Sequence, residues 1–268
     1  MSLLAIDHLT LSAGAQTLVS GLSLAIAAGE RVGLIGESGS GKSLTAMAAT
    51  GLLPPGITAA GSVLLGGRQV VGAPDRVLDR LRGTVTATIF QEPLTALDPL
   101  LRVGRQVAEP LRRRAARDGR TLDRHQLRRD VQALLEQVAL PHPERIARAY
   151  PHELSGGQRQ RIAIAMALAC QPQLLIADEP TTALDVTTQA EILKLLDTLV
   201  RERGMALLFI SHDLPIVAQV VQRVVVLRRG VAVERGPVEE VFARPRHEYT
   251  GALVAAARAF DAALGGSR

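Results

Sequence analysis

A glycine-rich turn lies between a short apolar segment and a helical pattern in residues 31–53, RVGLIGESGSGKSLTAMAATGLL. Gly36, four further residues and then Gly41-Lys42-Ser43 fit the P-loop pattern, in which a strand feeds such a turn and a helix follows it. In this pattern backbone N–H groups and the helix dipole bind phosphate oxygens, the lysine reaches the β and γ phosphates, and the hydroxyl binds magnesium. An incidental Gly/Ser-rich turn is the alternative. The residues expected to bind the phosphates are Gly36, Ser38, Gly39, Ser40, Gly41, Lys42, Ser43 and Leu44.

Further apolar segments alternate with helical patterns along the chain. They are RVGLIG (31–36), TATIF (86–90), LLIAD (174–178), ALLFISH (206–212) and RVVVLRRG (223–230). Continuous apolar strands separated by helices are typical of a parallel sheet that is covered on both faces. The first segments, LLAIDHLTLS and LVSGLSLAI, alternate more and indicate antiparallel strands. The sequence therefore predicts an α/β fold.

Helical patterns alone occupy the chain between Gln91 and Leu154. One apolar stripe at helical spacing, with arginines opposite, is formed by Leu127, Val131, Leu134, Leu135 and Val138. We interpret this region as an inserted helical subdomain. Its arginines are a solvated helical face or a nucleic-acid site, and the first interpretation is favoured because helical arginine stripes commonly lie at the surface.

An acidic pair follows the segment LLIAD. Asp178 ends a strand at the carboxyl edge of the sheet, where open α/β folds bind ligands, and is predicted to bind the magnesium held by Ser43. Glu179 is predicted to hold the attacking water; since an unperturbed glutamate is a weak base with a pKa of about 4.3, it would act mainly by positioning. A solvated acidic pair is the alternative.

Two more polar residues follow predicted core strands. A lone histidine is more often structural than chemical, but His212 leaves the carboxyl end of a strand and would point at the same pocket. Gln91 follows TATIF and could reach the metal or the water; taken alone it would be an ordinary surface glutamine.

The overall composition limits the classes of protein to which this chain can belong. The chain has 268 residues, 47% of them apolar and 21% charged, which suits a globular protein with a real core. Its longest apolar runs fall far short of the roughly 20 residues that a bilayer span needs. No secretory signal is expected from the first residues, and the single cysteine, Cys170, fits a reducing compartment such as the cytosol.

A second anion-binding turn occurs in ELSGGQRQR, residues 153–161. It lacks a lysine and a feeding strand, so it cannot form a complete nucleotide site, but it can complete one. The Ser155 hydroxyl and the Gly156 and Gly157 amides would bind a γ-phosphate held by the P-loop of another chain. Two chains facing head to tail would then bury two ATP molecules between them.

These motifs together resemble the nucleotide-binding subunit of ATP-binding cassette (ABC) transporters. The resemblance covers essentially the whole chain and rests on Gly36–Ser43, Gln91, LSGGQ at 154–158, LLIADEP at 174–180, ALD at 183–185 and His212. It implies a P-loop NTPase (RecA-like) mixed sheet core with an N-terminal antiparallel β-subdomain and an inserted α-helical subdomain. It also implies ATP hydrolysis with ATP and Mg²⁺, phosphate contacts from Ser155 to Gln158, a role for Asp185 in cross-talk between the two sites, and one for His212 at the γ-phosphate.

The implied domains are a RecA-like core with the β-subdomain in residues 1–91 and 160–238, a helical subdomain carrying the signature motif in 92–159, and a C-terminal tail in 239–268. Within the family, YPHELSGGQRQR and the tail RPRHEYTGALVAA are similar to importers of dipeptides, oligopeptides and nickel, and KSLTAMAATGLLPP to the first of their two ATPases. The implied partners are a second, non-identical ATPase subunit, two transmembrane permease subunits and an extracytoplasmic solute-binding protein, at the cytoplasmic face of the inner membrane.

This sequence departs from the family at several positions. Thr17 stands where many relatives place an aromatic residue against adenine, and Glu248 replaces the usual proline of the tail. With Cys170 alone the chain cannot hold the iron–sulfur cluster of longer relatives, so no metal beyond magnesium is expected.

A soluble ABC ATPase acting on nucleic acid or ribosomes is the alternative function, suggested by the basic pI of about 10.2. The long coiled coil of repair types and the paired cassettes of ribosomal types are both missing from this sequence, so no nucleic-acid partner is expected. Export, or regulation without a permease, is a third possibility. The apolar residues Pro93, Leu94, Leu97, Pro99 and Leu100 either dock onto the permease or are buried within the subdomain.

Overall fold

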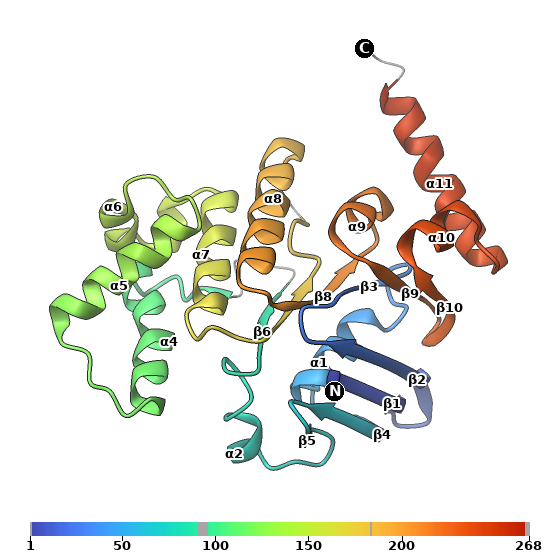
Figure 1. Cartoon of the computed structure of the whole chain (residues 1–268), viewed down its shortest axis with the longest axis horizontal. Helices are drawn as coiled ribbons and strands as arrows, with labels where there is room; N and C mark the ends of the chain where they lie inside the picture. The colour runs from blue at the N-terminus through green and yellow to red at the C-terminus, as the bar shows by residue number, and fades with distance from the viewer. Residues whose placement is uncertain (1, 91–95, 183, 266–268) are drawn as a thin grey trace. The chain divides into compact units, whose positions relative to one another are not determined.

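The computed structural model describes residues 2–90, 96–182 and 184–265 (Figure 1). Its contacts divide the chain into two compact units, residues 1–81 with 204–268 and residues 82–203. The expected helical insertion, residues 92–159, falls within the second unit, which also contains residues 160–203. Among the described residues, no helix combines the length and apolar character that crossing a bilayer requires.

An antiparallel sheet forms one part of the first unit. Its strands, in the order β2-β1-β4-β5, are β2 (Gln16–Ala27), β1 (Ser2–Ala13), β4 (Ile57–Leu65) and β5 (Arg68–Gln69). In β1 the side chains of Leu4, Ile6, Leu9 and Leu11 are buried, in keeping with the alternation of its sequence. The prediction of N-terminal antiparallel strands is confirmed, and β4 and β5 extend the sheet beyond it.

The predicted parallel strands are also confirmed in the first unit. Its second sheet has the order β10-β9-β3-β8, with β3 (Arg31–Ile35), β8 (Ala206–Ser211), β9 (Arg223–Arg228) and β10 (Val231–Pro237). Strand β3 is parallel to β8 and β9, whereas β10 returns antiparallel to β9. All six residues of β8 are buried, as expected of a strand in a parallel sheet that is covered on both faces. The helices of this unit are α1 (Lys42–Thr50), α2 (Asp75–Leu78), α9 (Leu214–Val220), α10 (Val238–Ala243) and α11 (Glu248–Gly265).

The second unit is mainly helical. Its parallel strands are β6 (Thr86–Ile89) and β7 (Leu174–Asp178). Its helices are α4 (Val103–Arg117), α5 (Arg124–Gln137), α6 (Pro143–Arg148), the short 3₁₀ helix η1 (Pro151–Glu153), α7 (Gly156–Leu168) and α8 (Val186–Glu202). The predicted apolar stripe of α5 is buried at Leu127, Val131, Leu135 and Val138, and half-buried at Leu134.

Short polar side chains begin three helices of the second unit. Asp123 caps α5, Ser155 caps α7 and Asp185 caps α8, each by accepting hydrogen bonds from backbone N–H groups of the first turn. Such caps satisfy donors that a helix cannot pair internally. The starting points of α7 and α8 are therefore fixed by the same residues that the sequence singles out as functional.

Candidate functional site

The P-loop connects β3 to α1 in the first unit, and two of its glycines have no room for a side chain. Gly36 has φ 150°, and a Cβ atom there would lie 2.1 Å from the carbonyl oxygen of Leu227. Gly41 has φ 101°, and a Cβ atom would lie 2.7 Å from Val19 Cγ2. Because the backbone adopts conformations that side chains disfavour and packs this closely, both positions require glycine.

Lys42 is buried under this loop. Its Nζ atom donates hydrogen bonds to the carbonyl oxygens of Gly36 and Glu37, each at 2.8 Å. Helix α1 begins at Lys42 without an acidic residue in its first turn. The ammonium group and the helix N-terminus therefore present positive charge to the loop, which suits phosphate.

The other predicted residues of the loop differ in exposure. Ser40 is buried, Gly41, Ser43 and Leu44 are half-buried, and Ser38 and Gly39 are exposed. Ser43 stands in the first turn of α1, directly after the lysine. Its hydroxyl belongs to the class of oxygen ligands that Mg²⁺ prefers.

The acidic pair ends β7 in the second unit. Asp178 is 4% exposed and closes the strand, as predicted. Glu179 has φ 46°, a left-handed conformation that is uncommon for a non-glycine residue. Its Oε2 atom accepts a hydrogen bond from Thr182 Oγ1 at 3.0 Å. The two neighbouring carboxylates are thus held by different means, Asp178 by burial in the strand and Glu179 by a strained turn.

Helix α7 supports this turn through a residue that sequence reasoning missed. Gln160 is 1% exposed, and its Nε2 atom donates to the carbonyl oxygen of Pro180 at 2.6 Å. The only signal in the sequence is a polar residue on the otherwise apolar inward face of the helix. Gln160 therefore links the signature helix to the turn that carries Glu179.

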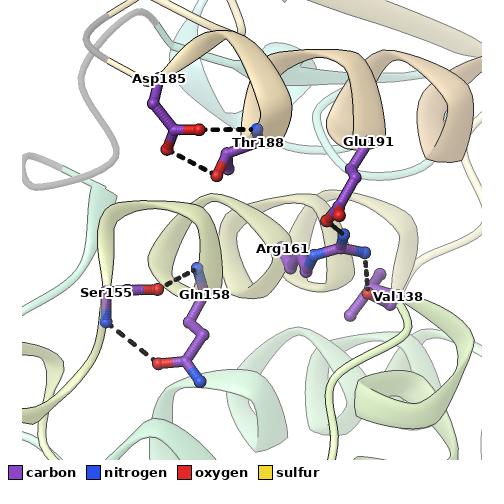
Figure 2. A network of polar contacts seen from close by, with 7 residues as sticks. All are labelled: Val138, Ser155, Gln158, Arg161, Asp185, Thr188 and Glu191. Carbon is purple, nitrogen blue, oxygen red and sulfur yellow. Dashed lines mark hydrogen bonds and ion pairs between the residues drawn. The ribbon is translucent and has the colours of Figure 1, made fainter.

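The second anion-binding turn forms a complete capping box at the start of α7 (Figure 2). Ser155 Oγ accepts from the backbone N–H of Gln158 at 3.2 Å, and Gln158 Oε1 accepts from the N–H of Ser155 at 3.0 Å. This reciprocal pair fixes the first turn of the helix. The structure therefore gives Ser155 and Gln158 a definite local role in holding this N-terminus.

The two glycines of this turn face the start of α8. A Cβ atom on Gly156 would lie 3.2 Å from Leu184 Cδ2, and one on Gly157 would lie 2.5 Å from Thr188 Cγ2. Close packing thus requires glycine at position 157, a reason that the sequence interpretation did not include. Arg161 adds a polar link between the same helices by donating to Glu191 Oε2 at 2.9 Å (Figure 2).

Asp185 caps α8 beside this contact (Figure 2). Its carboxylate accepts from the backbone N–H of Thr188 at 3.0 Å and from Thr188 Oγ1 at 2.7 Å. These hydrogen bonds hold the pKa of the Asp185 carboxyl below its usual value. Asp185 is exposed, so an ionised carboxylate stands at the surface next to the signature turn.

The remaining predicted residues lie in different settings. His212 is exposed and directly follows β8, and Asp213 caps α9 immediately after it. Gln91, Pro93 and Leu94 lie outside the described residues. The apolar residues between positions 93 and 100 are predicted either to dock onto the permease or to be buried within the subdomain. Of the described ones, Leu97 is 3% exposed and thus buried, whereas Leu100 is 82% exposed and Pro99 is also exposed. Thr17 is exposed in β2.

The predicted site residues are divided between the two units. The P-loop and His212 belong to the first, while Asp178, Glu179, Asp185 and the turn at 155–158 belong to the second. The helix N-terminus that begins with a lysine therefore belongs to the first unit, and the one fixed by a capping box belongs to the second.

Comparisons with known proteins agree with this arrangement. The profile of the ABC transporter family matches residues 19–182. A putative peptide import ATP-binding protein of Brucella ovis is 47% identical over 243 residues, covering 88% of this chain and 70% of that protein. The glutathione import ATP-binding protein GsiA of Pectobacterium atrosepticum is 46% identical over 254 residues, covering 92% of this chain but only 40% of that protein. Among solved structures, the dimeric post-hydrolysis state of the ATP-binding cassette MJ0796, bound to ADP and Pi, has a TM-score of 0.77 and 28% identity, covering 88% of this chain and 98% of that one.

Proposed function

This chain belongs to the ABC transporter family, and on that premise we propose that it is the ATP-hydrolysing subunit of an importer for peptides, nickel or a related small solute. We further propose that it works as an ATP-sandwich dimer. The observation that carries the proposal is the pair of unlike helix N-termini, one with a buried lysine and one fixed by a capping box. Neither has all the groups that a triphosphate needs, so each would complete the other across two chains.

The nucleotide would be bound by the P-loop. Gly36 and Gly41 let the loop backbone pack closely against Leu227 and Val19, and Lys42 would exchange its carbonyl partners for phosphate oxygens. The proposed contacts on this side are Gly36, Ser38, Gly39, Ser40, Gly41, Lys42, Ser43 and Leu44. The signature turn of the partner, from Ser155 to Gln158, would bind the γ-phosphate from the opposite side.

A magnesium ion fits the donor chemistry of the remaining residues. The hydroxyl of Ser43 and the carboxylate of Asp178 are oxygen ligands, and the amide of Gln91 would add a third. When bound, the ion would neutralise charge on the phosphate oxygens. The exposed position of His212 after β8 supports a contact to the γ-phosphate.

Glu179 is the proposed water-positioning residue. Its strained backbone and its hydrogen bond from Thr182 hold the carboxylate in one orientation, which is what positioning of a nucleophile requires. Asp185, fixed by Thr188, is proposed to link the two nucleotide sites of the dimer.

The names of the relatives support the importer assignment, since they specify import of peptides and of glutathione. The chain spans only part of these relatives, so the solute and the partners remain proposals. We propose a non-identical second ATPase subunit, two permease subunits and a solute-binding protein as partners, at the cytoplasmic face of the inner membrane. We likewise propose that residues 92–159 form the signature subdomain and that the exposed Leu100 belongs to its permease-facing surface.

The exposed arginines of α4 do not call for a nucleic-acid partner. Arg113 pairs with Glu109, and Arg117 pairs with Asp118, so part of their charge is balanced within the helix. Salt-sensitive binding of DNA or RNA at physiological ionic strength would revive the alternative function.

The test is Glu179→Gln in the assembled complex. Turnover of ATP should fall by about 10²-fold or more, because the variant loses a positioned base, while ATP-dependent pairing of the ATPase subunits persists. Glu144→Gln, the same change on the exposed surface of α6, is the matched control and should leave turnover unchanged. Undiminished hydrolysis by Glu179→Gln would refute the role, and full-speed hydrolysis by a strictly monomeric chain would refute the sandwich.

A further inference from the structure

The first peptide group of the P-loop, between Gly36 and Glu37, is held from both sides. Its carbonyl oxygen accepts a hydrogen bond from Lys42 Nζ at 2.8 Å. Its N–H group donates to the hydroxyl oxygen of Tyr249 at 2.9 Å. Because the C=O and N–H of a trans peptide point in opposite directions, the lysine and the tyrosine hold this peptide from opposite sides.

Tyr249 reaches the loop from the C-terminal helix α11, and both belong to the first unit. The side chain is 6% exposed, and the guanidinium carbon of Arg228 lies 5.0 Å from the centre of its ring. A cation above an aromatic face is attractive and restricts the ring. The hydroxyl therefore stands at a defined place and is not a chance surface contact.

The segment before α11 is itself anchored to the sheet. Glu234, in β10, accepts hydrogen bonds from the backbone N–H groups of Arg246 at 2.8 Å and His247 at 3.1 Å. The N–H of Tyr249 donates in turn to His247 Nδ1 at 3.1 Å. These successive hydrogen bonds fix the position of Tyr249 relative to the sheet that contains both β10 and β3, the strand that leads into the P-loop.

We propose that Tyr249 is a positioning residue of the nucleotide site, whose hydroxyl fixes the Gly36–Glu37 peptide and so keeps the P-loop in its phosphate-binding shape. The inference rests on the proposed function in one respect, that nucleotide binds at this loop. When Lys42 turns to phosphate, the carbonyl of Gly36 loses the ammonium group. The bond from Glu37 N–H to Tyr249 then restrains the peptide, and a loop ordered in advance binds its ligand more tightly.

Tyr249→Phe tests this, because it removes the hydroxyl and keeps the ring beneath Arg228. Loss of one hydrogen bond predicts that the Kd for a non-hydrolysable ATP analogue rises about 3- to 10-fold. KM for ATP should rise likewise, with kcat changed less than about twofold, since the catalytic groups are untouched. Amide exchange at Glu37, followed by NMR without nucleotide, should become faster. Tyr150→Phe makes the same chemical change in the second unit and should alter none of these quantities.

A complementary variant removes the donor in place of the acceptor. Glu37→Pro has no backbone N–H that could donate to Tyr249. Adding Tyr249→Phe to the Glu37→Pro variant should therefore change its Kd by less than about twofold. An unaltered Kd and unaltered Glu37 exchange in Tyr249→Phe would overturn the inference, as would an undiminished effect in the proline background. If the parent chain itself binds no ATP, the proposed function fails. The comparison of Glu37 amide exchange in the parent chain and in Tyr249→Phe still tests the role of Tyr249, because it needs no nucleotide.

Discussion

A Cβ atom on Gly157 would lie 2.5 Å from the methyl carbon of Thr188, so the first turns of α7 and α8 touch where the signature motif begins. Thr188 also donates its hydroxyl hydrogen to Asp185 at 2.7 Å. One side chain thus contacts both the signature glycine and the carboxylate proposed to link the two sites. Any movement of one turn relative to the other would therefore change the contacts of Thr188.

Gly157→Ala is expected to destabilise the protein by about 1–3 kcal/mol, the usual cost of overpacking a tight contact. Thr188→Ser keeps the hydroxyl that Asp185 accepts from and removes the methyl group that obstructs the alanine. The double variant should therefore recover much of the lost stability in urea denaturation. Strictly additive effects of the two changes would contradict the contact.

Asp185→Ser separates the two roles of the aspartate. Serine is a good N-cap, so the thermal midpoint should stay near that of the parent chain, whereas Asp185→Ala should lower it. If the carboxylate links the nucleotide sites, Asp185→Ser still weakens cooperativity in the dependence of hydrolysis on ATP concentration. Parent-like cooperativity in this variant would mean that Asp185 only caps the helix.

Features set by local geometry could be predicted from the sequence. The P-loop pattern predicts glycine at positions 36 and 41 and a lysine after them, and in the structure both glycines have positive φ and Lys42 donates to the Gly36 carbonyl within the loop. Strand β7 ends at Asp178 because an uninterrupted apolar run stops there. Strand β4 was missed, since its segment ITAAGSVLL has neither a clear alternation nor a continuous apolar run.

Features set by contacts between distant segments could not be predicted. Tyr249 and Glu37 are 212 residues apart, and Gln160 and Pro180 meet only because α7 packs beside the turn after β7. In both pairs one partner is a backbone group, which carries no signature in the sequence. The requirement for glycine at position 157 likewise depends on Thr188 of another helix.

Gly36→Ala and Gly39→Ala should differ sharply, although both glycines have positive φ. At Gly36 the new methyl group would meet backbone, the Leu227 carbonyl oxygen 2.1 Å away, whereas nothing lies within 4 Å at Gly39. Gly39→Ala should therefore cost only about 1–2 kcal/mol of left-handed strain, and Gly36→Ala considerably more. Urea denaturation of the two variants measures the difference, and equal losses would show that packing against Leu227 does not govern the loop.

Acid should weaken the attachment of the segment before α11 to β10, because it protonates the Glu234 carboxylate that accepts the hydrogen bonds of this segment. Partial burial acts to raise the pKa of this carboxyl, but hydrogen bonds, including those from the N–H groups of Arg246 and His247, outweigh it, so the pKa lies below the usual 4.5. A carboxyl with a lowered pKa stabilises the folded state fully above the unfolded-state value and loses that contribution as pH falls through the folded-state value. Stability and Glu37 amide protection should therefore be constant above about pH 5 and decline below about pH 4.5. In Glu234→Gln this part of the decline should vanish, because glutamine does not titrate, and an unchanged pH profile in that variant would assign the decline to other carboxylates.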